Sequence, residues 1–340
     1  MRSLVLTGER SLKVVEVPRP TAGDAEVELD VIATGVCGSD VHGYTGVNGR
    51  RFPGQVMGHE TVGVVTSSGS AHPVGTIVVV NPIVSCGVCT ACDAGERQVC
   101  AELRVIGVDP ALPGSFADTI VVPSRNVNPL ASGVPAVLGA LVEPLAVGFH
   151  ALMRSAPKPD DRLLVVGGGP IGQAAAIAGQ RAGVKVILVS EPVEARRKVL
   201  ASLGICAVPP EDLSLSVKSV LDGAATVVVD AVGTGASIES SLNHSTSRAR
   251  IVLVGMGAPE VSLRAYGISV AERTVVGSYC YSDDHFAQTA QWIGETSIDL
   301  SQLIGEACDL AAAPDAFRRA AAGTAPNKTL LLGRAARTAG

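Results

Sequence analysis

A glycine-rich turn between a predicted strand and a predicted helix restricts the fold of this chain more than any other feature. Residues 162–166 form an apolar run typical of a buried strand, and residues 167–172 follow at once with the spacing G-x-G-x-x-G. Residues 173–182 are rich in Ala and predict a helix, and residues 184–189 predict a second strand. The sequence therefore predicts a strand-helix-strand unit.

The same turn predicts a dinucleotide site, because its glycines let the backbone and the helix N-terminus approach a pyrophosphate. Glu191 lies at the end of the second predicted strand, where a carboxylate accepts hydrogen bonds from the adenosine ribose and repels a 2′-phosphate. This favours NAD. Arg196 follows closely and can receive a 2′-phosphate, so NADP stays open. We expect the cofactor to bind at Gly167, Gly169, Pro170, Ile171, Gly172, Glu191 and Arg196.

Length and composition limit the possible functions. The 340 residues suffice for about two domains, and further predicted strands at 225–231 and 250–254 continue an α/β pattern with a parallel sheet. A net charge of −5 and 3% aromatic residues argue against nucleic-acid binding. The apolar window 163–179 is interrupted by glycines and is too short to span a membrane, so we expect no membrane partner. No export signal is recognised at the N-terminus, and a cytoplasmic address is expected.

Four of the eight cysteines crowd into 15 residues with the spacing C-x2-C-x2-C-x7-C. Four thiolates brought together in a loop-rich segment favour a closed, tetrahedral zinc site that stabilises structure. A disulfide pair or a redox C-x-x-C is disfavoured in a reducing compartment, and an iron–sulfur cluster stays an alternative. The expected ligands are Cys86, Cys89, Cys92 and Cys100.

A second set of candidate metal ligands lies at the edges of predicted strands. Cys37 follows the apolar run 27–36, and His59 with Glu60 opens a second run at 61–66. Together a thiolate, an imidazole and a carboxylate would leave one position open, as in a catalytic zinc site. Glu143 lies in an otherwise apolar stretch, as a further ligand or as a charge at a helix N-terminus.

The combined motifs resemble the zinc-dependent medium-chain dehydrogenase/reductase family over essentially the whole chain, most closely its sorbitol (polyol) dehydrogenase branch. The motifs that carry the resemblance are Cys-Gly-Ser-Asp-Val-His at 37–42, Gly-His-Glu at 58–60, the cysteine segment, Gly-Ser-Phe-Ala-Asp at 114–118, Glu-Pro-Leu at 143–145 and the glycine turn.

The resemblance implies an α/β protein with a GroES-like, mainly-β catalytic domain and a Rossmann domain that contains a doubly wound parallel sheet. The catalytic domain would comprise residues 1–147, completed by 288–340, and the NAD-binding domain residues 148–287. Two zinc ions per chain are implied. Homo-oligomers are common in the family, so we expect a tetramer, or else a dimer.

The resemblance also assigns roles around the catalytic zinc. Cys37, His59 and Glu60 would be ligands, and Glu143 either a fourth ligand or the anchor of a metal-bound water. Asp40 would orient the His59 ring. Ser39 would accept the alcohol proton and pass it through the nicotinamide ribose to His42 and solvent.

The implied reaction is reversible oxidation of a secondary alcohol, on a polyol or related hydroxylated small molecule, to the ketone. Two departures from animal polyol dehydrogenases bear on the substrate, because Gly43 and Cys280 replace a Tyr and an Arg of that branch. Tyr44, Tyr279 and Tyr281 are candidates to substitute for them. The alternatives are a threonine or amino-alcohol dehydrogenase, which usually carries Asp-Pro where this chain has Glu-Pro at 143–144, and a non-catalytic NAD-binding zinc protein.

Overall fold

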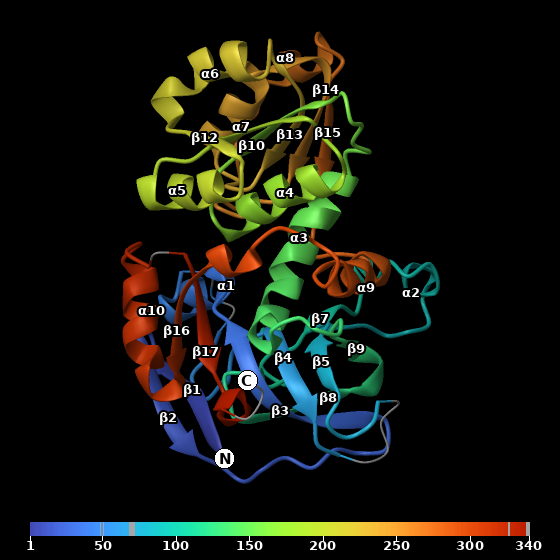
Figure 1. Cartoon of the computed structure of the whole chain (residues 1–340), viewed down its shortest axis with the longest axis vertical. Helices are drawn as coiled ribbons and strands as arrows, with labels where there is room; N and C mark the ends of the chain where they lie inside the picture. The colour runs from blue at the N-terminus through green and yellow to red at the C-terminus, as the bar shows by residue number, and fades with distance from the viewer. Residues whose placement is uncertain (48, 50, 68–71, 326, 338–340) are drawn as a thin grey trace. The chain divides into compact units, whose positions relative to one another are not determined.

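The computed structural model describes residues 1–47, 49, 51–67, 72–325 and 327–337. The chain divides into two compact units (Figure 1). The first comprises Met1–Glu143 together with Ser282–Gly340, and the second comprises Pro144–Tyr281.

The second unit contains a six-stranded, all-parallel sheet with the strand order β12-β11-β10-β13-β14-β15. This is the order of a doubly wound dinucleotide-binding sheet, so the predicted Rossmann domain is confirmed. The strands are β10 Arg162–Val166, β11 Val186–Ser190, β12 Cys206–Val208, β13 Ala225–Asp230, β14 Ser245–Leu253 and β15 Thr274–Gly277. The helices are α4 Pro170–Arg181, α5 Glu194–Ser202, α6 Leu213–Val220, α7 Gly235–Asn243 and α8 Ala265–Ser269, with a 3-10 turn at Pro210–Asp212.

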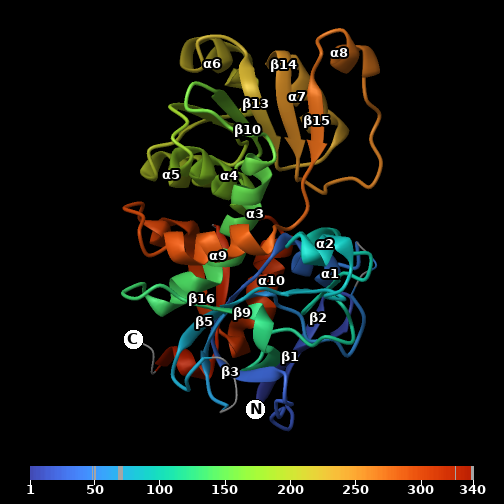
Figure 2. The same cartoon turned by 90° about the vertical axis from the view of Figure 1, so that its right-hand side faces the viewer.

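Burial explains why the strands of this sheet are so apolar. β10 is paired on both sides, and its Leu163, Leu164 and Val165 are fully buried, as expected for a central strand covered on both faces. α4 packs on β10 and β11, and α7 packs on β13 and β14 (Figure 2). β14 begins at Ser245, five residues before the predicted strand at 250–254. Its polar start was not recognised because the register shifts there and Arg248 has a φ of +62°.

The first unit is mainly β, as predicted. Its largest sheet has the order β16-β17-β3-β4-β5-β9, with β8 also paired to β3, and Figure 1 shows the C-terminal β16 and β17 beside β3. The strands of this unit are β1 Arg2–Gly8, β2 Ser11–Glu16, β3 Glu26–Gly35, β4 Glu60–Val65, β5 Ile77–Val80, β6 Ile83–Val84, β7 Arg104–Val105, β8 Thr119–Pro123, β9 Val127–Pro129, β16 Ile304–Asp309 and β17 Lys328–Leu332.

Helices and 3-10 segments connect these strands. The α-helices are α1 Gly38–Tyr44, α2 Thr90–Asp93, α3 Val142–Met153, which begins in this unit, α9 Asp283–Trp292 and α10 Ala313–Ala321. The 3-10 segments are Arg97–Val99, Ser124–Asn126, Ala136–Leu141, Leu300–Leu303, Leu310–Ala312 and Arg334–Arg337.

Strand pairing brings distant parts of the chain together at one end of the sheet. Gly35 is paired with Glu60 of β4 on one side and with Leu330 of β17 on the other. The ends of β3, β4 and β17 therefore meet, and α1 follows β3 directly at this point.

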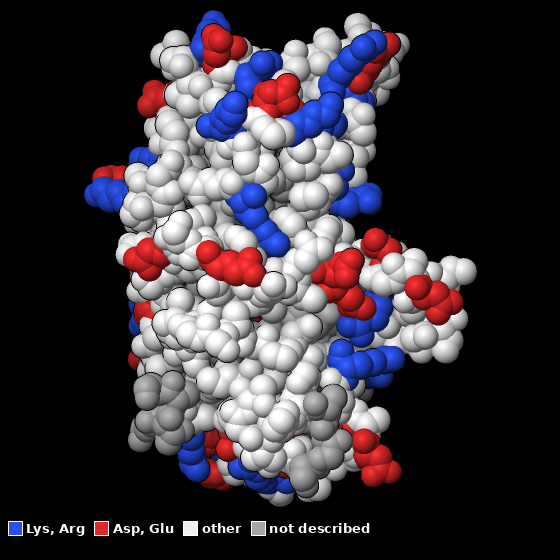
Figure 3. Space-filling view, turned by 45° about the vertical axis from the view of Figure 1, so that its right-hand side comes forward, with Lys and Arg blue, Asp and Glu red and all other residues white. Residues whose placement is uncertain are grey.

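The helical stretch Ala136–Met153 is long and apolar enough to cross a membrane, by length and composition alone, and the sequence analysis did not single it out. In the structure 78% of it is buried inside the protein, as in the core helix of a folded domain. On the face shown in Figure 3, Lys and Arg alternate with Asp and Glu over a mostly uncharged surface.

Candidate metal and cofactor sites

The four clustered cysteines meet in the loop between β6 and β7. All are free thiols, and four of their sulfur–sulfur distances lie between 3.5 and 3.9 Å. A zinc–thiolate bond of about 2.3 Å places the sulfurs of a tetrahedron about 3.8 Å apart. The segment therefore fits a zinc ion, and four protein donors leave no open position. The cluster comprises Cys86, Cys89, Cys92 and Cys100, which we call the cysteine lobe.

Local backbone geometry produces this arrangement. Cys89 caps α2, and Gly87 and Gly95 adopt φ values of +79° and +75°, which reverse the chain around the sulfurs. The Ser85 hydroxyl and the Gly87 N–H lie beside the Cys92 thiol and lower its pKa to about 6. A thiolate is the form that binds metal.

Ionic and amide contacts tie the lobe to the start of α9. The Arg97 Nε donates to a carboxylate oxygen of Asp283 at 2.7 Å, and Asn81 Nδ2 donates to the same oxygen at 3.2 Å. The backbone N–H of Asp283 donates in turn to the Gly95 carbonyl at 3.3 Å. The lobe thus holds a segment from the far end of the chain.

The second candidate set meets where β3, β4 and β17 end. One donor atom from each of Cys37, His59 and Glu60 lies within 4.8 Å of the others. We call this group the Cys37 pocket. His59 and Glu60 are 6% and 0% exposed. Soft thiolate, imidazole and carboxylate are a donor set that zinc accepts, and three protein ligands leave one position for a substrate oxygen.

Glu60 is held by a buried lysine that the sequence analysis missed. Lys328 Nζ donates to both carboxylate oxygens of Glu60, at 2.7 and 2.8 Å, and to the Val36 carbonyl at 3.3 Å. Gly35 makes room for this pair, because a Cβ there would lie 1.9 Å from Glu60 Oε2. The only sequence signal was a lysine at the head of a Leu-rich strand, 268 residues from its partner.

Asp40 connects the other two donors. Its Oδ2 accepts the backbone N–H of Cys37 at 3.1 Å, and its Oδ1 lies 3.6 Å from His59 Nδ1. Nδ1 therefore faces Asp40, which leaves Nε2 for the metal. Arg51, also missed from the sequence, donates to Asp40 Oδ1 at 3.4 Å, and both side chains are almost fully buried.

The charges in the Cys37 pocket favour a cation. Burial opposes a charged His59 ring, but Asp40, Cys37 and Glu143 outweigh it and raise the pKa of His59 to about 10. Burial likewise opposes the Lys328 charge, and Glu60, Cys37 and Glu143 raise its pKa. A pocket that stabilises protonated imidazole so strongly also attracts a divalent ion, which must displace that proton to bind.

Glu143 contributes to this field from the first turn of α3 and is 8% exposed. The group of donor atoms within 4.8 Å comprises Cys37, His59 and Glu60, and Glu143 is not a member of it. In this structure Glu143 therefore acts on the pocket through its charge.

The predicted proton-relay residues lie on α1. Ser39 is half-buried and His42 is exposed, and they are three positions apart, hence on one face of the helix. The suggestion that Tyr44 could take a substrate role is wrong. Tyr44 is 3% exposed and packs in the core against Phe317, with ring centroids 5.4 Å apart, because it lies on the opposite, inward side of α1.

In the second unit, the glycine turn leaves room for a cofactor. Gly167 has a φ of +92°, and a Cβ on Gly172 would lie 1.7 Å from the Gly167 carbonyl oxygen, so both positions require glycine. Gly169 caps α4 ahead of Pro170, and a Cβ there would meet only an Arg196 nitrogen, at 3.8 Å. The open side of the turn thus faces the N-terminus of α4, which suits a pyrophosphate. Ile171 is half-buried in the first turn of the helix.

Glu191 lies at the end of β11 and is bonded to this turn. Its carboxylate accepts the N–H of Gly168 and the N–H of Val193, each at 2.7 Å, and is 2% exposed. Arg196 Nη1 lies 3.8 Å from Glu191 Oε1. A carboxylate offers about four acceptor positions, and these two backbone N–H groups use two of them.

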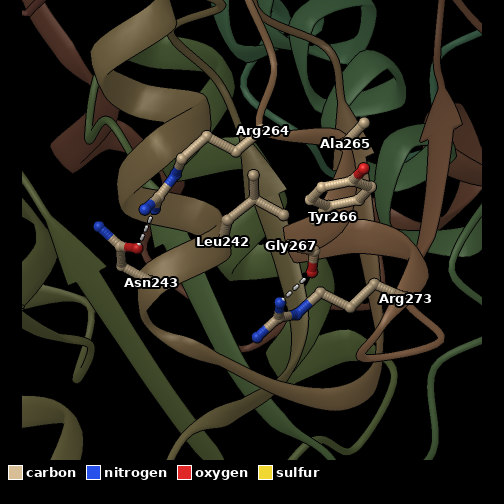
Figure 4. Close-up of a pocket in the computed structure, with 7 residues that line it drawn as sticks. All are labelled: Leu242, Asn243, Arg264, Ala265, Tyr266, Gly267 and Arg273. Carbon is tan, nitrogen blue, oxygen red and sulfur yellow. Dashed lines mark hydrogen bonds between the residues drawn. The ribbon is translucent and has the colours of Figure 1, made fainter.

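A separate hollow lies in the same unit beside α7 and α8 (Figure 4). Its two arginines already donate to protein acceptors. Arg264 donates to the Asn243 side chain, and Arg273 donates to the carbonyls of Gly267 and Ser245. The residues that line the hollow include no Cys, His, Asp or Glu, and its arginines are already hydrogen-bonded, so it differs from the two metal sites and from the glycine turn.

Comparison with known proteins places these sites in context. Residues 23–132 match the model of the alcohol dehydrogenase GroES-like domain, and residues 170–295 match that of the zinc-binding dehydrogenase domain. The 2-dehydro-3-deoxy-L-galactonate 5-dehydrogenase of Pseudoalteromonas atlantica is 36% identical over 321 residues, covering 91% of this chain and 92% of that protein. The sorbitol dehydrogenase of Bacillus subtilis is 27% identical over 333 residues, covering 94% and 93%.

Solved structures agree in fold. An Escherichia coli CFT073 protein, described as a short chain alcohol dehydrogenase complexed with NADH, matches with a TM-score of 0.89 at 28% identity. The match covers 98% of this chain and 99% of that one.

Proposed function

We propose that this chain reversibly oxidises a secondary alcohol of a polyol or sugar acid to the ketone, with zinc and NAD. The chain belongs to the zinc-dependent medium-chain dehydrogenase/reductase family, in its polyol dehydrogenase branch, and as an oxidoreductase it acts on CH–OH groups. The observation that carries this proposal is the donor set of the half-buried Cys37 and the buried His59 and Glu60, which suits zinc and leaves a ligand position open.

Zinc supplies a Lewis acid that lowers the pKa of an alcohol proton, and nicotinamide supplies the hydride acceptor. The chain's own residues would bind the metal and transfer the proton. Cys37, His59 and Glu60 would hold the metal, with Glu143 as a fourth ligand or as the anchor of a water. Ser39 would accept the alcohol proton while giving up its own hydroxyl proton to the relay, and the exposed His42, one turn along α1, would deliver a proton from the relay to solvent.

Metal stoichiometry tests the two sites. We propose two zinc ions per chain, a closed one in the cysteine lobe and an open one in the Cys37 pocket. Metal analysis of the purified protein should give two. A value of one, with the lobe alone loaded, would instead identify a non-catalytic NAD-binding zinc protein.

Glu191 supports NAD as the cofactor, because its buried carboxylate would accept ribose hydroxyls and repel a 2′-phosphate. Glu191→Ala should reduce the NAD/NADP ratio of kcat/KM by about tenfold to a hundredfold, as a hydrogen bond to a charged group contributes roughly 1.5–3 kcal/mol. Arg196→Ala is the matched variant and should reduce activity with NADP more than with NAD. A wild-type preference for NADP would refute the assignment.

A substrate panel tests the reaction. Polyols, cyclitols, sugar acids and amino alcohols, each assayed with NAD and NADP, should give the highest kcat/KM with a polyol or sugar acid. Activity confined to L-threonine and other amino alcohols would favour the alternative dehydrogenase and overturn the proposed substrate class.

We also propose that the enzyme is a cytoplasmic homo-oligomer, a tetramer or else a dimer, without nucleic-acid or membrane partners. The net charge of −5 and the mixed charges on the face shown in Figure 3 argue against nucleic-acid binding. Light scattering of the purified protein tests the oligomeric state, and a monomeric mass would refute it.

A further inference from the structure

Arg51 carries a buried positive charge that the proposed reaction does not use directly. It lies in the segment between α1 and β4, and its side chain is 1% exposed. Arginine is almost never buried to this extent unless it is paired. Its Nη2 lies 3.4 Å from Asp40 Oδ1, and the Asp40 side chain is 0% exposed. The ion pair is therefore inside the unit rather than on its surface.

The neighbouring helix is shaped to admit this arginine. Gly43 of α1 faces the arginine stem, and a Cβ at Gly43 would lie 2.1 Å from Arg51 Cγ and 2.9 Å from Arg51 Cβ. The guanidinium therefore reaches Asp40 along a path that only glycine at position 43 leaves free.

Asp40 contacts two of the candidate metal donors, Cys37 and His59, so its orientation affects both. One of its oxygens accepts the Cys37 N–H at 3.1 Å and the other lies 3.6 Å from His59 Nδ1. A carboxylate that must fix a backbone and a ring has to keep one orientation. A cation bonded to the oxygen that faces the ring restricts its rotation and offsets its buried charge.

We propose that Arg51 is a positioning residue for the Cys37 pocket: it fixes Asp40, and through Asp40 it directs the Cys37 thiolate and the His59 ring toward the metal. The inference rests on the proposed function, because it takes the Cys37 pocket to be a zinc site. Gly43 and Arg51 then form one functional pair, in which the glycine makes the approach of the arginine possible.

The test compares zinc release from the two sites of the holoenzyme into a colorimetric chelator. The cysteine lobe contains neither Arg51 nor Asp40, so its ion is an internal reference. Arg51→Met should release one ion per chain about tenfold faster than wild type, the low end for an outer-shell change, while the second ion leaves at the wild-type rate. Arg51→Lys, which restores the charge, should recover most of the difference.

Two further variants separate positioning from general packing. Arg19→Met removes another arginine paired with carboxylates, Glu28 and Asp30, and should release both ions as wild type does. In an Asp40→Asn background, Arg51→Met should change the release rate by less than about twofold, because the residue acts through Asp40.

Wild-type release from Arg51→Met, equal acceleration at both sites, or an Arg51→Lys variant that behaves like Arg51→Met would overturn the inference. If Arg51→Met does not fold, Gly43→Ala carries the test: it keeps the arginine but displaces its stem, so wild-type release would again overturn the proposal. A wild-type protein with one zinc ion would refute the proposed function itself, whereas two ions released alike in all variants would refute only the role of Arg51.

Discussion

The cysteine lobe and the Cys37 pocket present metal donors in two different ways. The lobe takes its four sulfurs from one 15-residue loop, and its geometry follows from local turns. The pocket takes its donors from the ends of β3 and β4, and its lysine from β17, so it exists only when the sheet is assembled. A local site is defined by spacing, whereas a non-local site is defined by topology.

The two sites also differ in how their charge is balanced. In the lobe, the negative charge of the four thiolates would be balanced by the bound metal ion itself. The pocket adds two buried cations of its own, Lys328 and Arg51, against the carboxylates of Glu60 and Asp40. Its carboxylates are therefore partly neutralised before any metal binds, which suits a site that must keep an open and electrophilic position.

The largest expected effect is the loss of the pocket's thiolate. Cys37→Ala should reduce zinc from two ions per chain to one and reduce the dehydrogenase activity by about a thousandfold or more, because a Lewis acid supplies several kcal/mol to the reaction. Nucleotide binding, measured by NADH fluorescence, should persist. Retention of both ions and of activity would show that the pocket is not the active site.

Removing the buried lysine should have the next largest effect. Lys328→Met leaves the Glu60 carboxylate buried without its cation and should reduce the free energy of unfolding by about 3–5 kcal/mol, measured by denaturant titration. Adding Glu60→Gln should recover much of this loss. Lys198→Met, in an exposed Lys–Glu pair, is the control and should change little. An unchanged Lys328→Met protein would show that the pair is not needed to balance the pocket.

The pH dependence of zinc binding should distinguish the sites more finely. The pKa of His59 is about 10 in the metal-free fold and 6.5 in its reference state, so the protonated ring stabilises the metal-free protein below pH 6.5 and this stabilisation is lost as the pH rises to 10. Zinc must displace that proton, and pocket affinity should rise by about tenfold per pH unit between pH 7 and 9 from His59 alone. Competition with a chelator measures the slope of zinc affinity against pH, which Asp40→Asn should reduce. A pH-independent affinity would contradict the raised pKa of His59.

The smallest effect is expected from breaking the lobe. Cys92→Ser should release one ion and make cleavage between residues 80 and 105 several-fold faster in limited proteolysis, while the nucleotide unit stays folded. An unchanged cleavage pattern would mean that the ion does not stabilise the loop.

The sequence was most informative where contacts are local. The glycine turn, the strand-helix-strand unit around it and the meeting of the four cysteines could all be predicted, because each depends on neighbours within about thirty residues. The pocket was inferred in fragments, Cys37 apart from His59 and Glu60, and their meeting came from a family resemblance rather than from spacing.

The missed residues share one physical cause. Lys328 and Arg51 are buried charged side chains whose carboxylate partners are distant or unmarked in the sequence, and the pairing of β17 with β3 and the absence of a side chain at Gly43 make room for them. The suggestion for Tyr44 was wrong because closeness in sequence to the 37–42 motif does not show which side of a short helix faces the core.

The position of Lys328 has a consequence for the order of events during synthesis. It is made 268 residues after Glu60, an interval of roughly a quarter of a minute to a minute at ordinary translation rates. Once Cys100 has been made, 40 residues after Glu60, the nascent chain carries all four lobe cysteines for the rest of that time, while the glutamate still lacks its lysine. We therefore expect the ribosome-bound chain to acquire the structural ion first, and the catalytic ion to enter only after the last strand has closed the sheet.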